Sequence, residues 1–246
     1  MTAQPRVYLC DVEGTVAPIS LVSEQLFPYA RAHFAEFLQK HINEVGVRAD
    51  LALLAEENHA ETAAVVPRLP QLDDPSAIDG PRFRLDAFVY LVWLMDRDRK
   101  STALKSLQGK VWKVGFESGE LKGTLFPDVL PAIERWSKRG KVAIYSSGSV
   151  EAQQLLFRYS TYGDLTPRIS GHFDTKTGPK SEPTSYTAIA RKLEVAPDEA
   201  IFLSDVVREL DAARAAGFAS RLVVREGNQP IEDSHGHETV ASFEAL

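Results

Sequence analysis

The chain has 246 residues, of which 44% are hydrophobic and 25% charged, and 28 Lys and Arg against 34 Asp and Glu give a net charge of −6. This is an ordinary globular composition, and the length suits one large domain or a core domain with an inserted smaller one. The mild acidity argues against nucleic acid or an anionic membrane as the partner. No apolar run reaches the roughly 18 residues of a membrane helix and the start lacks a signal-peptide pattern, so we expect a cytoplasmic protein.

The first predicted element is a buried strand at residues 6–10, a short apolar run that ends in the polar loop 11–15. The single cysteine of the chain, Cys10, lies in this strand. One cysteine excludes an internal disulfide and a zinc site built from cysteines.

Residues 17–123 have a different pattern, with long apolar periodicities of 3.6 residues and no convincing strand. The proline-rich stretch 66–81 is expected to be an irregular connection. We therefore predict an all-helical domain at 17–123, inserted into a core domain made of residues 1–16 and 124–246.

After the insert, strand and helix patterns alternate. Apolar runs at 141–145, 200–203 and 221–224 predict three more strands, and helical patterns fall at 131–138, 150–158, 185–193 and 206–216. Ser149 is the expected N-cap of the helix at 150–158. Gly217 is the expected glycine just after the end of the helix at 206–216. The alternation predicts an α/β fold with a doubly wound, Rossmann-like parallel sheet.

Asp11 and Glu13 follow the first strand, two residues apart, with Gly14 and Thr15 after them. Two carboxylates this close repel unless a cation or a shared proton compensates, and Mg²⁺ prefers carboxylate, phosphate and water oxygens. An isolated acidic pair, however, is more often a cap for the following loop. The other polar clusters decide between these interpretations.

Ser146 and Ser147 follow the second strand, Asp205 follows the third, and Lys180 lies in a loop between them. Alone, each has an ordinary explanation: a turn for the serines, solvent exposure for the lysine and a helix cap for Asp205. In a doubly wound sheet, ligands bind beyond the carboxyl ends of the strands, where all these groups are expected. Carboxylates, hydroxyls and a cation together indicate a phosphate site.

The motif order resembles that of the haloacid dehalogenase-like phosphatases, whose core is a Rossmann-like sheet with a cap domain. It comprises DVEGT at 11–15, SSGS at 146–149, Lys180 and FLSDVVRE at 202–209. Further segments resemble the enolase-phosphatases of methionine salvage within that superfamily. These are APIS at 17–20, LFPYA at 26–30, TALKSLQG at 102–109, YSSGSVEAQ at 145–153 and GHFDTK at 171–176.

The resemblance implies a role for each acidic residue. Asp11 would attack the phosphoryl group and form an aspartyl phosphate. Glu13 stands where most of the superfamily has an aspartate that acts as acid and base and binds the metal through its backbone carbonyl. Asp205 would complete a Mg²⁺ site with Asp11 and Glu13, and Glu209 would hold a metal-bound water.

Ser146, Ser147 and Lys180 would bind the phosphoryl oxygens. The implied substrate is 2,3-diketo-5-methylthiopentyl-1-phosphate, which is enolised and then dephosphorylated to acireductone. Glu13 and a residue of the helical insert both remain candidates for the enolisation base. The insert would close over the site as a cap, and four of its aromatic residues are candidates for an apolar wall around the methylthio end: Phe27, Phe83, Trp93 and Trp112. The resemblance also implies a monomer.

Two alternative functions fit the sequence less well. A phospho-receiver module has similar chemistry, but its phosphorylated aspartate follows a later strand, and it lacks a large helical insert. A generic capped phosphatase acting on another small phosphomonoester is the closer rival, against which the segments outside the site argue. His235 and His237 are expected to lie in an exposed polar tail.

Overall fold

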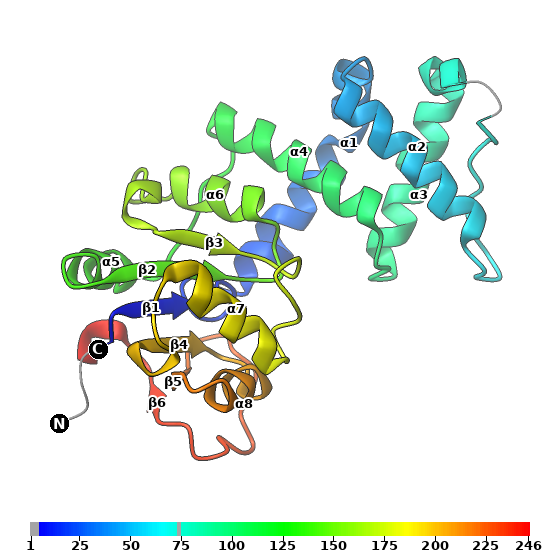
Figure 1. The fold of residues 1–246 in the computed structure, drawn as a ribbon. Coiled ribbons are helices and arrows are strands. Elements are labelled where there is room, and N and C mark those ends of the chain that lie inside the picture. Colours follow the sequence, from blue (N-terminus) through cyan, green and yellow to red (C-terminus); the bar gives the residue numbers. More distant parts are fainter. Residues whose placement is uncertain (1–4, 73–74) are drawn as a thin grey trace. The chain divides into compact units, whose positions relative to one another are not determined.

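The computed structural model describes residues 5–72 and 75–246. The contacts within the chain divide it into two units. Figure 1 shows the chain coloured from the N-terminus to the C-terminus. The core unit comprises the N-terminal residues through Gln25 together with Phe116–Leu246, and the helical unit comprises Leu26–Gly115. The helical unit is thus shorter at both ends than the predicted insert, 17–123. Its action as a cap stays a prediction.

The core unit is built on a six-stranded sheet in the order β3-β2-β1-β4-β5-β6, with every neighbouring pair parallel. The strands are β1 (Val7–Cys10), β2 (Lys141–Tyr145), β3 (Gly171–Phe173), β4 (Ala200–Ser204), β5 (Ala219–Val223) and β6 (Thr239–Val240). From β1 the chain moves to one side through β2 and β3, and then returns to the other side with β4. The sheet therefore has its switch point at β1, where doubly wound sheets bind ligands.

Helices cover both faces of this sheet, which explains why its strands are continuous apolar runs. They are α5 (Val129–Trp136), α6 (Val150–Arg158), α7 (Pro183–Leu193) and α8 (Val207–Ala215). Val7 and Leu9 pack in one cluster with α7 and α8, whereas Tyr8 points to the opposite face and stacks on Trp136 of α5, 4.4 Å between ring centroids. Short 3₁₀ turns lie at Thr166–Arg168, Pro197–Glu199 and Phe243–Ala245.

Two predicted helix ends, the start of α6 and the end of α8, are confirmed by the local geometry. The Ser149 hydroxyl accepts a hydrogen bond from the Ala152 amide at 3.2 Å and so caps α6. Gly217, just after α8, has a φ of 93°, in the left-handed region that favours glycine. β3 and β6 were not predicted, because strands of three and two residues are too short to show a periodicity.

The helical unit consists of α1 (Phe27–His41), α2 (Val45–Ala60), α3 (Pro81–Asp96) and α4 (Thr102–Ser118), the last of which runs into the core unit. A π-helical segment, Leu21–Leu26, precedes α1, and a 3₁₀ turn, Pro75–Asp79, precedes α3. No strand occurs among the described residues of this unit. Residues 66–72 and 80 are irregular, as predicted, whereas residue 81 begins α3. Residues 73 and 74 lie outside the described residues.

Two of the four aromatic candidates belong to the interior of the helical unit. Phe83 and Trp93 are buried in its apolar core, and the Trp93 indole donates to the Val65 carbonyl at 3.0 Å. Phe27, in contrast, is 41% exposed. It stacks on Trp112 with 6.3 Å between ring centroids, so these two remain candidates for an apolar wall.

The prediction of an exposed tail was wrong for His237, which is 5% exposed. Its Nε2 lies 3.1 Å from Asp211 Oδ1, and His235 Nδ1 lies 2.6 Å from Asp211 Oδ2. Both histidines therefore tie the C-terminal segment to α8, just before that segment joins the sheet as β6. In the described part of the chain, no helix has both the length and the apolar character needed to cross a membrane.

Candidate active site

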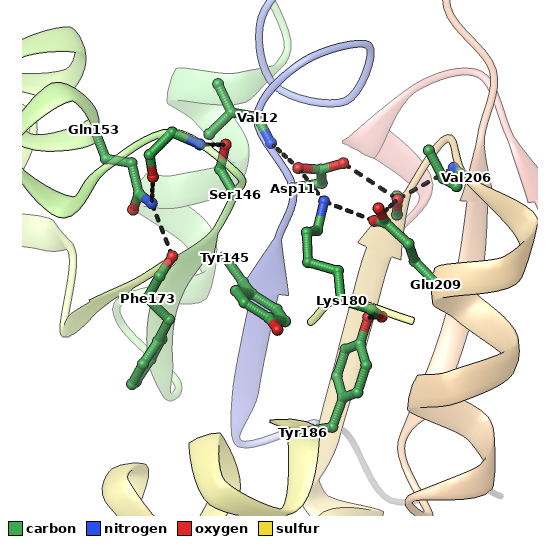
Figure 2. Close-up of polar contacts among 12 residues, drawn as sticks. Asp11, Val12, Tyr145, Ser146, Gln153, Phe173, Lys180, Tyr186, Val206 and Glu209 are labelled. Carbon is green, nitrogen blue, oxygen red and sulfur yellow. Dashed lines mark hydrogen bonds and ion pairs between the residues drawn. The ribbon is translucent and has the colours of Figure 1, made fainter. Parts of the chain in front are cut away.

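The parallel register brings three of the predicted residues to one edge of the sheet. Cys10 of β1 pairs with Ile144 of β2 on one side and with Leu203 of β4 on the other. Asp11 directly follows Cys10, and Ser146 and Asp205 each come two residues after these partners. The carboxyl ends of three adjacent strands thus present Asp11, Ser146 and Asp205 together. Figure 2 shows two of these residues, Asp11 and Ser146.

Lys180 joins this edge from the loop before α7. Its Nζ lies 2.7 Å from Asp11 Oδ1 and 2.6 Å from Glu209 Oε2, and its side chain is only 9% exposed. The explanation of Lys180 as a solvated surface lysine is therefore wrong. Asp11 Oδ1 also accepts a hydrogen bond from the Val12 amide at 2.7 Å. Figure 2 shows the ammonium between the two carboxylates.

Ser204, the last residue of β4, is fully buried and was not anticipated. Its hydroxyl lies 3.3 Å from Asp11 Oδ2 and 3.2 Å from Glu209 Oε2, and it accepts a hydrogen bond from the Val206 amide at 3.1 Å. The Ser204 hydroxyl thereby lies between the carboxylates of Asp11 and Glu209. The only signal in the sequence is a polar residue that ends an otherwise apolar strand.

A second set of contacts fixes the loop after β2. Ser146 is buried, its hydroxyl accepts from the Gly148 amide at 3.1 Å, and its own amide donates to the Phe173 carbonyl at 3.2 Å. Gln153 of α6 donates to the carbonyls of Gly148 and Phe173 at 2.9 and 2.8 Å. Ser147 follows as an exposed residue. Gln153, also unanticipated, thus ties this loop to β3.

The electrostatics of the site are dominated by excess negative charge. Burial, followed by repulsion from Asp11, raises the pKa of Glu13 and of Glu209, and raises the pKa of Asp205 to about 7. For Lys180, burial opposes the charge, but Asp11 and Glu209 outweigh it and raise the pKa. Lys180 is therefore protonated, while the carboxylates around it compete for positive charge.

Comparisons with known proteins show which family this chain resembles. A family model for haloacid dehalogenase-like hydrolases matches residues 5–217. The chain is 50% identical over 239 residues to the enolase-phosphatase E1 of Synechococcus elongatus, covering 97% of this chain and 96% of that protein. It is 41% identical to the enolase-phosphatase E1 of Danio rerio, covering 98% and 94% of the two chains.

The chain belongs to the enolase-phosphatase family of haloacid dehalogenase-like hydrolases. Among solved structures, the UTR4 protein of Saccharomyces cerevisiae is similar, with a TM-score of 0.76 and 34% identity, covering 99% of this chain and 100% of that one. A dehalogenase with 18% identity and a TM-score of 0.55, covering 100% and 96%, shares the fold. The predicted fold class and family are confirmed.

Hydrolases of this enolase-phosphatase family generally use a divalent metal, and the donor chemistry of the site fits one. Gly14, at a φ of 68°, approaches Asp205 so closely that a Cβ there would lie 2.3 Å from Asp205 Oδ2 and 3.0 Å from Asn228 Oδ1. Hard oxygen donors with surplus negative charge suit Mg²⁺. Among residues 5–72 and 75–246, no three acidic, histidine or cysteine side chains already converge as metal ligands.

The structure also tests the ordinary explanation of Asp205 as a helix cap. The N-cap of α8 is Val206, and no side chain caps that position. Asp205 instead lies against Gly14, in the loop that follows β1. A carboxylate whose pKa is raised to about 7 costs stability unless a cation offsets it, as expected for a functional group.

Proposed function

We propose that this chain enolises 2,3-diketo-5-methylthiopentyl-1-phosphate and then hydrolyses its phosphate, giving acireductone (1,2-dihydroxy-3-keto-5-methylthiopentene) in methionine salvage. The observation that carries the proposal is the buried contact of Lys180 with both Asp11 and Glu209, at the switch point of a chain 50% identical to an enolase-phosphatase E1. The phosphate would bind beyond the ends of β1, β2 and β4.

Asp11 is the proposed nucleophile. Its carboxylate attacks phosphorus, an aspartyl phosphate forms, and the bond from phosphorus to the substrate oxygen breaks. A water then attacks the same phosphorus and releases inorganic phosphate, which returns Asp11 to its free carboxylate. The Val12 amide and the Lys180 ammonium, both 2.7 Å from Oδ1, fix the orientation of the attacking group.

Glu13 is the proposed acid and base of the hydrolysis. It would protonate the departing substrate oxygen and later accept the proton of the attacking water. Burial and the neighbouring Asp11 raise the pKa of Glu13, which favours the protonated form that an acid needs. For the enolisation step, Glu13 and a residue of the helical unit both remain candidates for the base.

Ser146, Ser147 and Lys180 are the proposed phosphoryl-binding residues. Asp11, Glu13 and Asp205 are the proposed holders of Mg²⁺, which when bound would offset charge on the phosphoryl and enediolate oxygens. The excess of carboxylates supports this assignment, since Lys180 is already engaged by two of them. Glu209, which pairs directly with Lys180, would orient the ammonium in addition to any contact with a metal-bound water.

The test follows two signals at once with the diketo phosphate and Mg²⁺: the absorbance of the enolised product and the release of phosphate. We expect many turnovers and one phosphate for each acireductone. A single, stoichiometric phosphoryl transfer would instead support a receiver-like module. Phosphate release from other small phosphomonoesters, with none from the diketo phosphate, would support a generic capped phosphatase.

A further inference from the structure

Lys180 depends on a loop that has no regular structure of its own, yet its ammonium is held between two buried carboxylates. Loop residues are ordinarily more mobile than the elements they connect. The lysine needs a defined backbone position, because a shift of about 1 Å at a charged site changes catalysis strongly. The contacts of residues 178–180 show what supplies that position.

Three consecutive carbonyls of this loop each accept a hydrogen bond from a different buried hydroxyl. Tyr145 donates to the Gly178 carbonyl at 2.8 Å, Ser185 donates to the Pro179 carbonyl at 2.7 Å, and Tyr186 donates to the Lys180 carbonyl at 2.7 Å. We call these three side chains the hydroxyl clamp. They replace the sheet or helix bonds that such carbonyls would otherwise make.

The clamp residues stand on rigid elements. Tyr145 ends β2, whereas Ser185 and Tyr186 lie in the first turns of α7, and all three are at most 2% exposed. The Tyr145 and Tyr186 rings meet edge to face with centroids 5.6 Å apart, and Tyr186 contacts Phe202 in the same way at 5.1 Å. Packed aromatic rings have few accessible rotamers, so the two phenol oxygens are fixed in space.

The same rings lie next to the ammonium. Lys180 Nζ is 5.9 Å from the Tyr145 ring centroid and 6.0 Å from that of Phe202, within reach of a cation–π attraction. Figure 2 shows Tyr145 and Tyr186 beside the lysine side chain. One aromatic cluster thus contacts both ends of Lys180, its backbone carbonyl and its charge.

Gly178 makes the close approach possible. Its φ is 148°, and a Cβ there would lie 2.2 Å from the Ser185 hydroxyl oxygen. Any larger residue would push the loop away from Ser185. The loop sequence and the clamp are therefore matched to each other.

We propose that Tyr145, Ser185 and Tyr186 are positioning residues that hold the Lys180 ammonium in place before the phosphate arrives. The inference rests on the proposed role of Lys180 in binding the phosphoryl group. A preformed cation does not have to be ordered when the substrate binds, so the clamp strengthens phosphate binding and transition-state stabilisation together.

The test compares Tyr145→Phe and Tyr186→Phe with Tyr90→Phe, all measured in the full chain. Tyr90 is a matched control, since it is a tyrosine that is also buried, 1% exposed, but in the helical unit. We expect each clamp variant to lose roughly tenfold in kcat/KM and in affinity for inorganic phosphate with Mg²⁺. Tyr90→Phe should show a similar shift in melting temperature with wild-type kinetics. Clamp variants with wild-type phosphate affinity and kcat/KM would overturn the proposal.

A second readout does not depend on activity. Acetylation of lysines by acetic anhydride, followed by mass spectrometry, should modify Lys180 slowly in the wild type, and faster in Tyr145→Phe and Tyr186→Phe but not in Tyr90→Phe. An unchanged Lys180 rate in both clamp variants would overturn the clamp. If the wild type neither binds phosphate nor turns over, the proposed function fails, whereas the labelling pattern still reports on the clamp.

Discussion

The active-site edge of the core unit and the interior of the helical unit bury very different groups. At the sheet edge, Asp11 and Glu209 are buried with Lys180 between them, and Asp205 has its pKa raised to about 7 by burial and by Asp11. The interior of the helical unit is an apolar cluster built around residues such as Phe34, Phe83 and Leu91. The first arrangement costs stability, as expected of a catalytic site, and the second supplies stability.

The largest expected effect is on turnover at the sheet edge. Asp11→Asn removes the proposed nucleophile while keeping the shape of the side chain, so we expect a loss of about three orders of magnitude or more in kcat. Circular dichroism and the melting temperature should stay close to the wild type. Near-normal turnover of Asp11→Asn would reject its assignment as nucleophile.

A substitution in the core of the helical unit should lower stability, whereas Asp11→Asn should lower turnover. Phe83 is 2% exposed, so Phe83→Ala leaves a cavity and should lower the free energy of unfolding by about 3–5 kcal/mol. Denaturant unfolding measures this loss, and Leu85→Ala on the same helix, at a residue that is 58% exposed, is the control. Equal losses for the two variants would contradict the description of Phe83 as core.

Asp205→Asn should separate function from stability at a single position. It removes a proposed metal ligand, so the Mg²⁺ concentration for half-maximal activity should rise roughly tenfold or more. It also removes a carboxylate whose charged form is disfavoured by burial and by Asp11. The metal-free variant should therefore melt at a higher temperature than the metal-free wild type at pH 8. A lower melting temperature there would show that the charge is not costly.

The smallest predicted effect is a pair of opposite pH dependences. Burial lowers the pKa of His172 from 6.5 to about 4, so the unfolded chain binds a proton more readily and stability falls as pH drops from 6.5 towards 4. Hydrogen bonding to Asp211 raises the pKa of His235. Its contribution is fully present below pH 6.5 and is lost as pH rises.

Urea unfolding at several pH values measures both dependences. His172→Phe should flatten the loss of stability between pH 6.5 and 4, because it removes the group that titrates. His235→Asn should lower stability at acid pH and leave it unchanged at pH 8. If both variants changed the pH profile in the same direction, one of these two assignments would be wrong.

The strands and the residues that follow them could be predicted from the sequence because each signal is local. An apolar run followed closely by a polar residue such as Asp11, Ser146 or Asp205 indicates both a buried strand and a candidate site residue. Parallel pairing then brings the carboxyl ends of these strands together. The helices after Ser149 and before Gly217 carried capping signals. Lys180 has no distinctive local pattern, and it was singled out by its place in a loop between the second and third strands and by the motif order of the family.

The supporting residues could not be predicted, because their contacts join distant parts of the chain. Ser204 contacts Asp11 across 193 positions, and Tyr145 reaches the Gly178 carbonyl across 33. Tyr145 and Tyr186 both look like ordinary core residues in the sequence. His237 looks like part of a polar tail, and its contacts with Asp211 and Ser220, formed only after folding, explain its burial.

The central claim is that Asp11, held by Lys180, receives the phosphoryl group. Mixing excess protein with the diketo phosphate and Mg²⁺, quenching in acid and reducing with borohydride would convert an aspartyl phosphate to homoserine. Mass spectrometry should then find homoserine at position 11, and none in Asp11→Asn. Phosphate release at the wild-type rate with no modification at position 11, or with homoserine at another aspartate, would contradict the account.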